Sequence, residues 1–334
     1  MKPFIRQLLK CVLLLFAVSI VAFVLVGLSP VDPVQANVGQ AAYTSMSEVK
    51  RAQLASYWGA DVPIWERYVN WIAGVFTGDF GTSLRYNQPV LTVLAERSAN
   101  TLLLMTIAWL ISGVLGFIMG VVAGVFQGRL ADKVIRIYSF VLASTPAFWL
   151  GLLMLVVFSV WLGIFPLGFS APIGKAAADV TLLDALHHVA LPALTLSIIG
   201  VANIALHTRE KVIDIMNSSY VRFARMRGES EKSIVLHHVL RNAALPALTL
   251  QFASIAEIFG GSVLVEQVFS YPGLGQAAVT AGVGGDAPLL VGIAIVSALI
   301  VFVGNLAANI LYQVVDPRIR AGEEETIVKD WVNE

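Results

Sequence analysis

Apolar runs separated by polar segments set the pattern of the whole chain. A bilayer core needs roughly 20 consecutive apolar residues per helix, and six stretches approach or exceed that length. Because the pattern is helical throughout, we predict an all-α integral membrane protein with about six transmembrane helices. The predicted spans are 9–29, 100–126, 137–164, 190–208, 243–265 and 288–313.

The first apolar run is predicted to be a retained anchor rather than a cleaved signal peptide. Lys2, Arg6 and Lys10 precede it, as in a signal peptide, but the run is longer than a usual signal core. The segment Leu28-Ser29-Pro30 is also a poor small-x-small cleavage site. These choices predict four regions: an anchor helix (1–30), an extracytoplasmic loop or cap (31–99), a core transmembrane domain (100–316) with a cytoplasmic coupling segment (209–242), and a cytoplasmic tail (317–334).

Composition supports a membrane protein independently. Of the 334 residues, 57% are hydrophobic and 13% are charged, whereas soluble domains carry about 25% charged residues. The formal net charge is zero, so no overall field favours nucleic acid. A single cysteine, Cys11, excludes an internal disulfide and a cysteine-rich metal cluster.

The positions of Lys and Arg predict the orientation. Positively charged residues collect on the cytoplasmic side of membrane proteins, and most of the 22 lie in segments that would share one side if the N-terminus is cytoplasmic. The predicted outer loop 165–189 holds one Lys or Arg residue, and the predicted outer loop 266–287 holds none. We therefore expect a multi-pass protein of a bacterial cytoplasmic membrane, with both termini cytoplasmic. The inner residues are Lys2, Arg6, Lys10, Arg129, Lys133, Arg136, Arg209, Lys211, Arg222, Arg225, Arg227, Lys232, Arg241, Arg318, Arg320 and Lys329.

The predicted outer loop contains an aromatic-rich amphipathic stretch, 46–71. Such stretches lie at a membrane interface or pack on a partner. Two interpretations remain open: a small helical cap on the protein's own outer face, or a docking surface.

A basic segment, 220–249, separates two apolar spans and is placed to contact something in the aqueous phase. We predict a short helix near Ser219–Arg227, ended by Gly228 in a positive-φ conformation. Ser230 would cap a second helix, with Glu231 in its first turn. Because that helix leads to Pro246 and the next span, a push on this helix–turn–helix elbow would reach the membrane.

Two further patterns concern helix packing. Gly116, Gly120, Gly124 and Gly128 recur every four residues, which favours close approach of another helix over a gating hinge. The sequence ALPALTL occurs twice, beginning at Ala190 and at Ala244. We interpret both copies as helix starts, because proline fits the first turn of a helix.

Several motifs resemble those of the dipeptide/oligopeptide/nickel permease family of ABC importers. The elbow resembles that family's "EAA" loop, although it lacks the leading glutamate and carries Glu229 where an apolar residue is usual. Val31 likewise replaces a glycine. The motifs are Ala224, Gly228 and Leu245-Pro246 of the elbow, Asp32-Pro33, Gly78-Asp79-Phe80-Gly81 with Ser83-Leu84, Glu266–Gly275 (EQVFSYPGLG), Asp286 with Pro288, and Asp316–Arg320.

The resemblance implies a type I ABC importer permease fold and a set of partners. These are a second related permease, most simply in a heterodimer, two cytoplasmic ATPase subunits and an extracytoplasmic solute-binding protein. ATP would be used by the partner ATPase, and this chain would bind no cofactor, metal or nucleic acid, only membrane lipid. The implied ATPase-coupling residues are Ala224, Arg225, Arg227, Gly228, Glu229, Leu245 and Pro246.

The chemistry of an enzyme is not evident in the sequence. The stretch 228–233 lacks the second glycine of a GxxxxGK[ST] phosphate loop, so we predict no ATPase site and no catalytic residues. An intramembrane hydrolase is disfavoured because no HExxH or Ser/His arrangement appears. His187-His188 invites a nickel-ligand interpretation, but adjacent helical histidines point in different directions.

The alternative function is a self-contained, ion-coupled secondary transporter. Such carriers place several ionisable groups inside their spans, whereas Glu257 is the one clear mid-span carboxylate here. Peptides, nickel and metal chelates all remain open as substrates.

Glu257 itself has two interpretations. A carboxylate inside a span is costly, so it should face a partner or water. It either forms a structural hydrogen bond with Asn203, Asn305 or Asn309, or it lines the translocation path together with Asn203.

Overall fold

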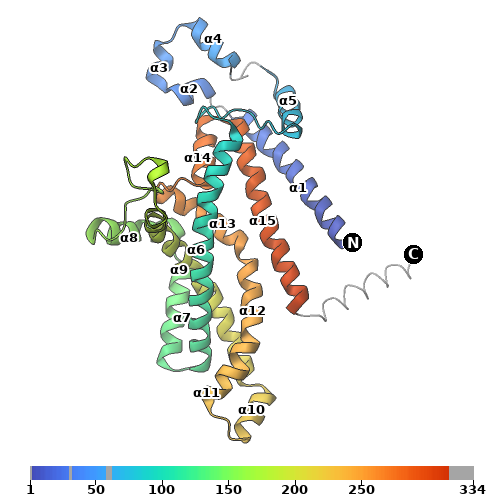
Figure 1. Ribbon diagram of the computed structural model, residues 1–334, viewed down its shortest axis with the longest axis vertical. Coiled ribbons are helices and arrows are strands. Elements are labelled where there is room, and N and C mark those ends of the chain that lie inside the picture. The colour runs from blue at the N-terminus through green and yellow to red at the C-terminus, as the bar shows by residue number, and fades with distance from the viewer. Residues whose placement is uncertain (1, 30–31, 58–61, 316–334) are drawn as a thin grey trace. The chain divides into compact units, whose positions relative to one another are not determined.

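The computed structural model describes residues 2–29, 32–57 and 62–315, which are predominantly helical (Figure 1). Within these residues the only extended pairing is an isolated bridge between Thr82 and Pro89. The α-helices are α1 (Lys2–Gly27), α2 (Pro33–Val38), α3 (Gln40–Ser45), α4 (Glu48–Tyr57), α5 (Ile64–Phe76), α6 (Val90–Val125), α7 (Leu130–Ala143), α8 (Ala147–Met154), α9 (Leu182–Met216), α10 (Ser219–Met226), α11 (Glu231–Ile234), α12 (Leu240–Ala253), α13 (Ile255–Val268), α14 (Leu274–Gly284) and α15 (Ala287–Val315); η1 (Leu155–Trp161) and η3 (Val235–Val239) are π-helical and η2 (Ala177–Asp179) is a 3₁₀ turn.

Four helical stretches in the described part of the chain are long and apolar enough to cross a bilayer singly. These are Leu9–Gly27, Val90–Val125, Leu182–Met216 and Ala287–Ile310. Two bent pairs bring the number to six if each pair forms one span: Leu130–Ala143 with Ala147–Trp161, and Glu231–Ala253 with Ile255–Val268. The prediction of an all-α membrane protein with about six spans is confirmed.

The helix bounds differ from the predicted spans. The helix expected over 100–126 begins at Val90, and the one expected over 190–208 extends over Leu182–Met216. The stretch 137–164 is not one straight helix, because α7 and α8 meet at 107° around Pro146. Hydropathy measures only how apolar a stretch is, and a bend leaves that unchanged. The pattern therefore could not reveal this bend. The predicted tail 317–334 and the Asp316–Arg320 motif lie outside the described residues.

The interpretation of the two ALPALTL copies as helix starts is wrong. Pro192 and Pro246 both lie inside helices, α9 and α12. Each proline removes one i→i−4 backbone hydrogen bond, yet the helix continues because neighbouring residues pack. Val189 and Leu191 are fully buried beside Pro192, and Ala243 is buried one turn before Pro246.

The chain divides into two compact units, which we describe separately. The first comprises Met1–Leu103, Pro166–Val189 and Glu266–Phe302. One of its hydrophobic clusters joins α1, α5 and α15 through Phe23, Tyr68, Trp71 and Val291.

Buried carboxylates of two family-like motifs make hydrogen bonds inside this first unit. The Ser83 hydroxyl donates to Asp286 Oδ2 at 2.6 Å, and Asp286 also accepts from the Leu289 N–H at the start of α15. The fully buried Glu266 accepts from Thr101 Oγ1 at 2.7 Å and from the Gln276 N–H at 3.0 Å. These carboxylates therefore cap helix N-termini, where negative charge is favourable.

The second unit comprises Leu104–Phe165, Ala190–Val265 and the described residues from Val303 onward. In it, α6 and α9 approach so closely that a Cβ added at Gly120 would lie 2.5 Å from Thr208 Cβ, and one at Gly124 would lie 2.5 Å from Val212 Cγ1. Close packing by the glycine stripe is thus confirmed for Gly116, Gly120 and Gly124. Gly128 does not belong to the stripe, because α6 ends at Val125 and Gly128 has φ +77° with open space around it.

A buried ion pair joins α7 to α9 in the same unit. Asp132 is fully buried and accepts from Arg209 Nε at 2.5 Å and Nη2 at 2.9 Å. The Gly128 N–H also donates to Asp132 at 2.8 Å. This pair fixes the loop between α6 and α7 against α9.

Candidate functional site: the α10–α12 elbow

The turn between α10 and α11 has the predicted backbone geometry. Gly228 adopts φ +84°, and a Cβ there would meet nothing within 4 Å. The Gly228 N–H donates to the Arg225 carbonyl and the Glu229 N–H to the Ala224 carbonyl, which closes the end of α10. The prediction of a helix ended by a positive-φ glycine is confirmed.

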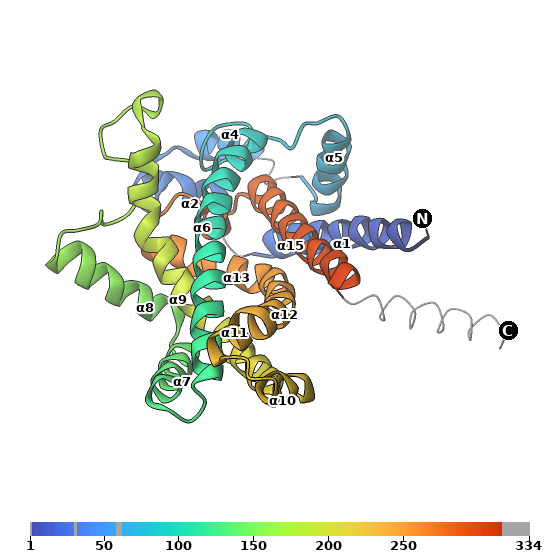
Figure 2. The ribbon, with the colours of Figure 1, turned by 60° about the horizontal axis from the view of Figure 1, so that its bottom comes forward.

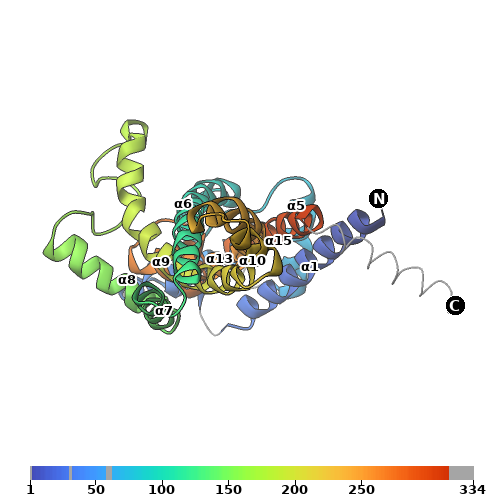
Figure 3. The ribbon, with the colours of Figure 1, turned by 90° about the horizontal axis from the view of Figure 1, so that it is seen from below.

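The second limb of the elbow is a continuous rod. Ser230 caps α11, its hydroxyl accepting from the Ser233 N–H at 3.3 Å as predicted. The helix passes through the π-helical turn η3 directly into α12. Figure 1 shows α10 and α11 at one end of the second unit, below α12, and Figure 3 shows them from that end.

The inner face of the elbow is part of a hydrophobic core. Val221 and Ala224 of α10 and Ile234 of α11 are buried together with Val212 and Ile215 of α9. Val121 of α6, Val239 of η3 and Ala243 of α12 complete this cluster. A displacement of α10 therefore has to move the rod or α9, because packed interiors are nearly incompressible.

The outer face of α10 is apolar but uncovered. Tyr220, Phe223 and Met226 are 44%, 58% and 77% exposed. Arg222, Arg225 and Arg227 are exposed as well. Large exposed apolar side chains among cations, on a rigidly supported helix, are typical of a protein-docking surface.

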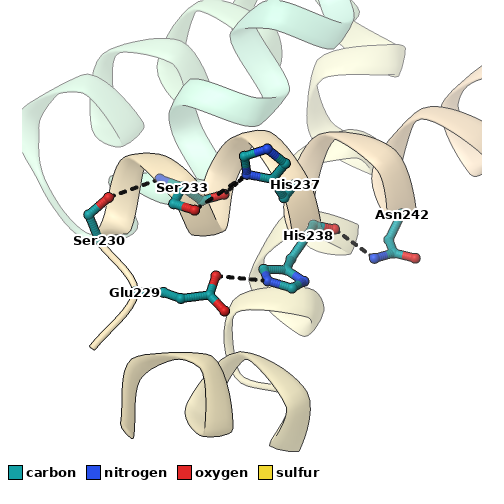
Figure 4. Close-up of polar contacts among 6 residues, drawn as sticks. All are labelled: Glu229, Ser230, Ser233, His237, His238 and Asn242. Atoms are coloured by element: carbon teal, nitrogen blue, oxygen red, sulfur yellow. Dashed lines mark hydrogen bonds and ion pairs between the residues drawn. The ribbon is translucent and has the colours of Figure 1, made fainter. Parts of the chain in front are cut away.

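An ion pair and a second polar contact hold the turn (Figure 4 shows the second). Arg225 makes a bidentate pair with Glu231, at 2.7 and 3.2 Å, and this carboxylate raises the pKa of the Arg225 guanidinium. Glu229 Oε2 lies 3.2 Å from His238 Nε2. The Asn242 amide donates to the His238 carbonyl at 2.6 Å. Glu229, which departs from the family pattern, thus contacts the rod directly.

The structure brings only part of the predicted coupling set together. Ala224, Arg225, Arg227, Gly228 and Glu229 all lie at the turn. Leu245 and Pro246 lie in α12, roughly 20 Å further along the rod at 1.5 Å per residue. Residues 209–216 of the predicted coupling segment are the end of α9, which continues beyond the predicted end of its span at 208.

Sequence reasoning missed the ion pairs. Arg225 and Glu231 are six residues apart and meet only because the glycine turn reverses the chain. Asp132 and Arg209 are 77 residues apart, so no local pattern relates them.

Glu257 lies in the first turn of α13, directly after the bend at Ser254. Its carboxylate accepts from the Asn203 amide at 3.4 Å, and the side chain is otherwise exposed. Glu257 was predicted to lie in the middle of a helical span. It lies instead at the N-terminus of a helix, where the helix dipole stabilises negative charge. Of the three asparagines proposed as partners, Asn203 is the one placed against it.

The two adjacent histidines of α9 point apart. His188 is buried with its Nδ1 2.9 Å from the Gly168 carbonyl oxygen, whereas His187 is exposed. In the described part of the chain, no three His, Cys, Asp or Glu residues are grouped to hold a metal ion.

Two family models match this chain along most of its length. The binding-protein-dependent transport system inner membrane component matches residues 113–321, and the N-terminal model of such membrane components matches residues 1–105. The chain belongs to the binding-protein-dependent transport permeases. It is therefore a membrane-spanning permease subunit of an ATP-driven importer, and no finding favours the self-contained ion-coupled carrier.

Named relatives cover nearly all of this permease. It is 35% identical over 316 residues to the oligopeptide transport system permease protein AppB of Bacillus subtilis, covering 94% of this chain and 98% of the relative. It is 33% identical over 316 residues to the glutathione transport system permease protein GsiC of Escherichia coli K12, covering 95% and 98%. Membership of this family implies ATPase and solute-binding partners and a multi-pass place in the inner membrane.

Proposed function

We propose that the outer face of the α10–α12 elbow is the surface through which a partner ATPase drives this permease. One observation carries the proposal: α10 exposes Phe223 and Met226 outward while Val221 and Ala224 lock it into the core shared by α6, α9 and α12. A force on the outer face therefore reaches three membrane helices. ATP is bound and hydrolysed by the partner, and this chain has no catalytic residues of its own.

Peptides or peptide-like molecules are the proposed cargo. Relatives that cover nearly the whole chain are named for oligopeptide and glutathione transport. These names favour peptides over the nickel and metal chelates that the sequence alone left open.

The proposed assembly contains a second, related permease in a heterodimer, two ATPases and an extracytoplasmic binding protein. The basic elbow and the basic turn between α6 and α7 face the cytoplasm in this proposal, together with both termini. The positive-inside rule supports that orientation.

Glu257, with Asn203, is proposed to line the translocation path. Its carboxylate is exposed on the isolated chain although α13 belongs to a candidate membrane span. Because a charge is costly in lipid, the exposed carboxylate should face a partner subunit or water, where it would favour cargo bearing an amine.

Exchange of Gly228 tests the coupling role of the elbow. A Cβ added at Gly228 meets nothing within 4 Å, so the expected effect of Gly228→Val is conformational. The left-handed backbone costs roughly 1–2 kcal/mol for such a residue. We expect the complex to assemble while uptake and binding-protein-stimulated ATP hydrolysis fall together. Gly228→Asn is the matched control, because asparagine tolerates positive φ, and it should retain most uptake. Equal, wild-type uptake in both variants would overturn the coupling role.

A further inference from the structure

Helix α5 packs on the C-terminal half of α1. The Tyr68 hydroxyl lies 2.9 Å from Ser19 Oγ, and the Tyr68 ring meets Phe23 edge-on with centroids 5.3 Å apart. A Cβ added at Gly27 would lie 2.9 Å from Ile64. The two helices thus run in opposite directions, and Figures 1 and 2 show α5 next to α1.

This packing fixes the depth of α5. Its contacts on α1, from Ser19 to Gly27, lie within the apolar span Leu9–Gly27. If α1 crosses the bilayer, α5 lies beside the half of the bilayer that α1 reaches last. At 1.5 Å per residue, its 13 residues extend about 20 Å, which is enough to follow that half of the span.

One of the two sides of α5 that α1 leaves uncovered is apolar. Trp65, Val69 and Phe76 are 64%, 60% and 85% exposed, and they are spaced so that they share one face of the helix. Glu66 and Asn70 are exposed on a different face. The helix therefore has one face on α1, one uncovered apolar face and one polar face.

The uncovered part of α1 has the same apolar character. Toward the N-terminus of α1, beyond the contact with α5, Phe16 and Val12 lie on the same side of the helix as Ser19 and Phe23. They are 49% and 55% exposed. Hydrocarbon is the natural neighbour of such residues in a membrane span. Tryptophan and phenylalanine are also the residues that anchor helices at the membrane interface.

We propose that α5 is a membrane-embedded helix of the outer leaflet, whose face of Trp65, Val69 and Phe76 contacts lipid acyl chains. The predicted cap over 46–71 is then part of the membrane domain in its last third. The occupant of this face is lipid rather than the binding protein or the second permease. The inference requires that α1 spans the bilayer with the N-terminus cytoplasmic, the orientation proposed above, and it does not depend on the role of the elbow.

Site-directed spin labelling of the full importer in lipid nanodiscs tests the proposal. In a Cys11→Ser background, single cysteines replace Trp65, Val69 or Phe76, with Glu66 and Asn70 as matched controls on the same helix. Variants that keep binding-protein-stimulated ATP hydrolysis are labelled with a nitroxide. Leu25, 65% exposed on α1, supplies a lipid-facing reference.

The labels report which medium surrounds each residue. For labels at positions 65, 69 and 76 we expect collisions with dissolved oxygen to exceed those with chromium oxalate several-fold, as at position 25. For labels at positions 66 and 70 we expect collisions with chromium oxalate to exceed those with oxygen. Protection from both reagents at 65, 69 and 76 would show that a protein partner covers the face. Preferential access to chromium oxalate there would show water. Either result overturns the proposal.

A second measurement does not depend on cysteine variants. Acyl-brominated lipids should quench tryptophan fluorescence less in Trp65→Phe than in the unmodified importer, because a lipid-exposed ring has been removed. An unchanged quenched fraction counts against the proposal.

Discussion

Glu257 combines a charged group, a helix N-terminus and a membrane segment in one residue. Glu257→Gln keeps the shape and the hydrogen bond with Asn203 but removes the charge. If the carboxylate lines the path, uptake of amine-bearing peptides should fall several-fold, while assembly and thermal stability stay near those of the unmodified importer. The measurement is peptide uptake at several pH values, with an uncharged peptide as the control cargo. Unchanged uptake at every pH would leave Glu257 a structural residue only.

Individual residues of the elbow were predictable where a single position dictates local backbone geometry. Gly228 predicts a turn because glycine is favoured where a helix ends in a positive-φ conformation. Ser230 predicts a helix start because its hydroxyl can accept from a free N–H of the first turn. The pairs Arg225–Glu231 and Asp132–Arg209 were not predictable, because each depends on a chain reversal or on tertiary packing.

The contact between α6 and α9 depends on having no side chain at Gly120. A Cβ there would lie 2.5 Å from Thr208 Cβ and 2.7 Å from the Ala205 carbonyl oxygen. We expect Gly120→Ala to destabilise the importer by about 1–3 kcal/mol, the usual cost of overpacking. The measurement is the melting temperature of the purified complex.

Gly260→Ala is the matched control for that exchange. It is also a glycine within a helix, but an added Cβ there meets nothing within 4 Å. It should leave the melting temperature unchanged or raise it slightly, since alanine is the better helix former. Equal melting temperatures for the two variants would contradict close packing as the role of the stripe.

At the level of whole helices, hydropathy predicted where the spans lie better than it predicted how they bend. The apolar runs gave the number of spans, but the bends of 107° and 50° fall within runs that look continuous. Pro192 and Pro246 misled because the first-turn preference of proline is a local rule, and buried neighbours override it.

For the molecule as a whole, composition and motif spacing were sufficient to predict a transport permease. Low charge and long apolar runs required a membrane, and the motifs pointed to an importer driven by a separate ATPase. Hydropathy could not show that 64–76 packs along α1, because that stretch is amphipathic and shorter than a span.

Reconstitution with defined subunits tests the central claim, that this chain is the permease of an ATP-driven importer. Proteoliposomes receive the chain alone, or with its second permease, the two ATPases and the binding protein. We predict ATP hydrolysis and peptide uptake only in the complete system, both lost when the ATPases are omitted. Uptake by the chain alone, driven by an ion gradient and indifferent to ATP, would contradict the account.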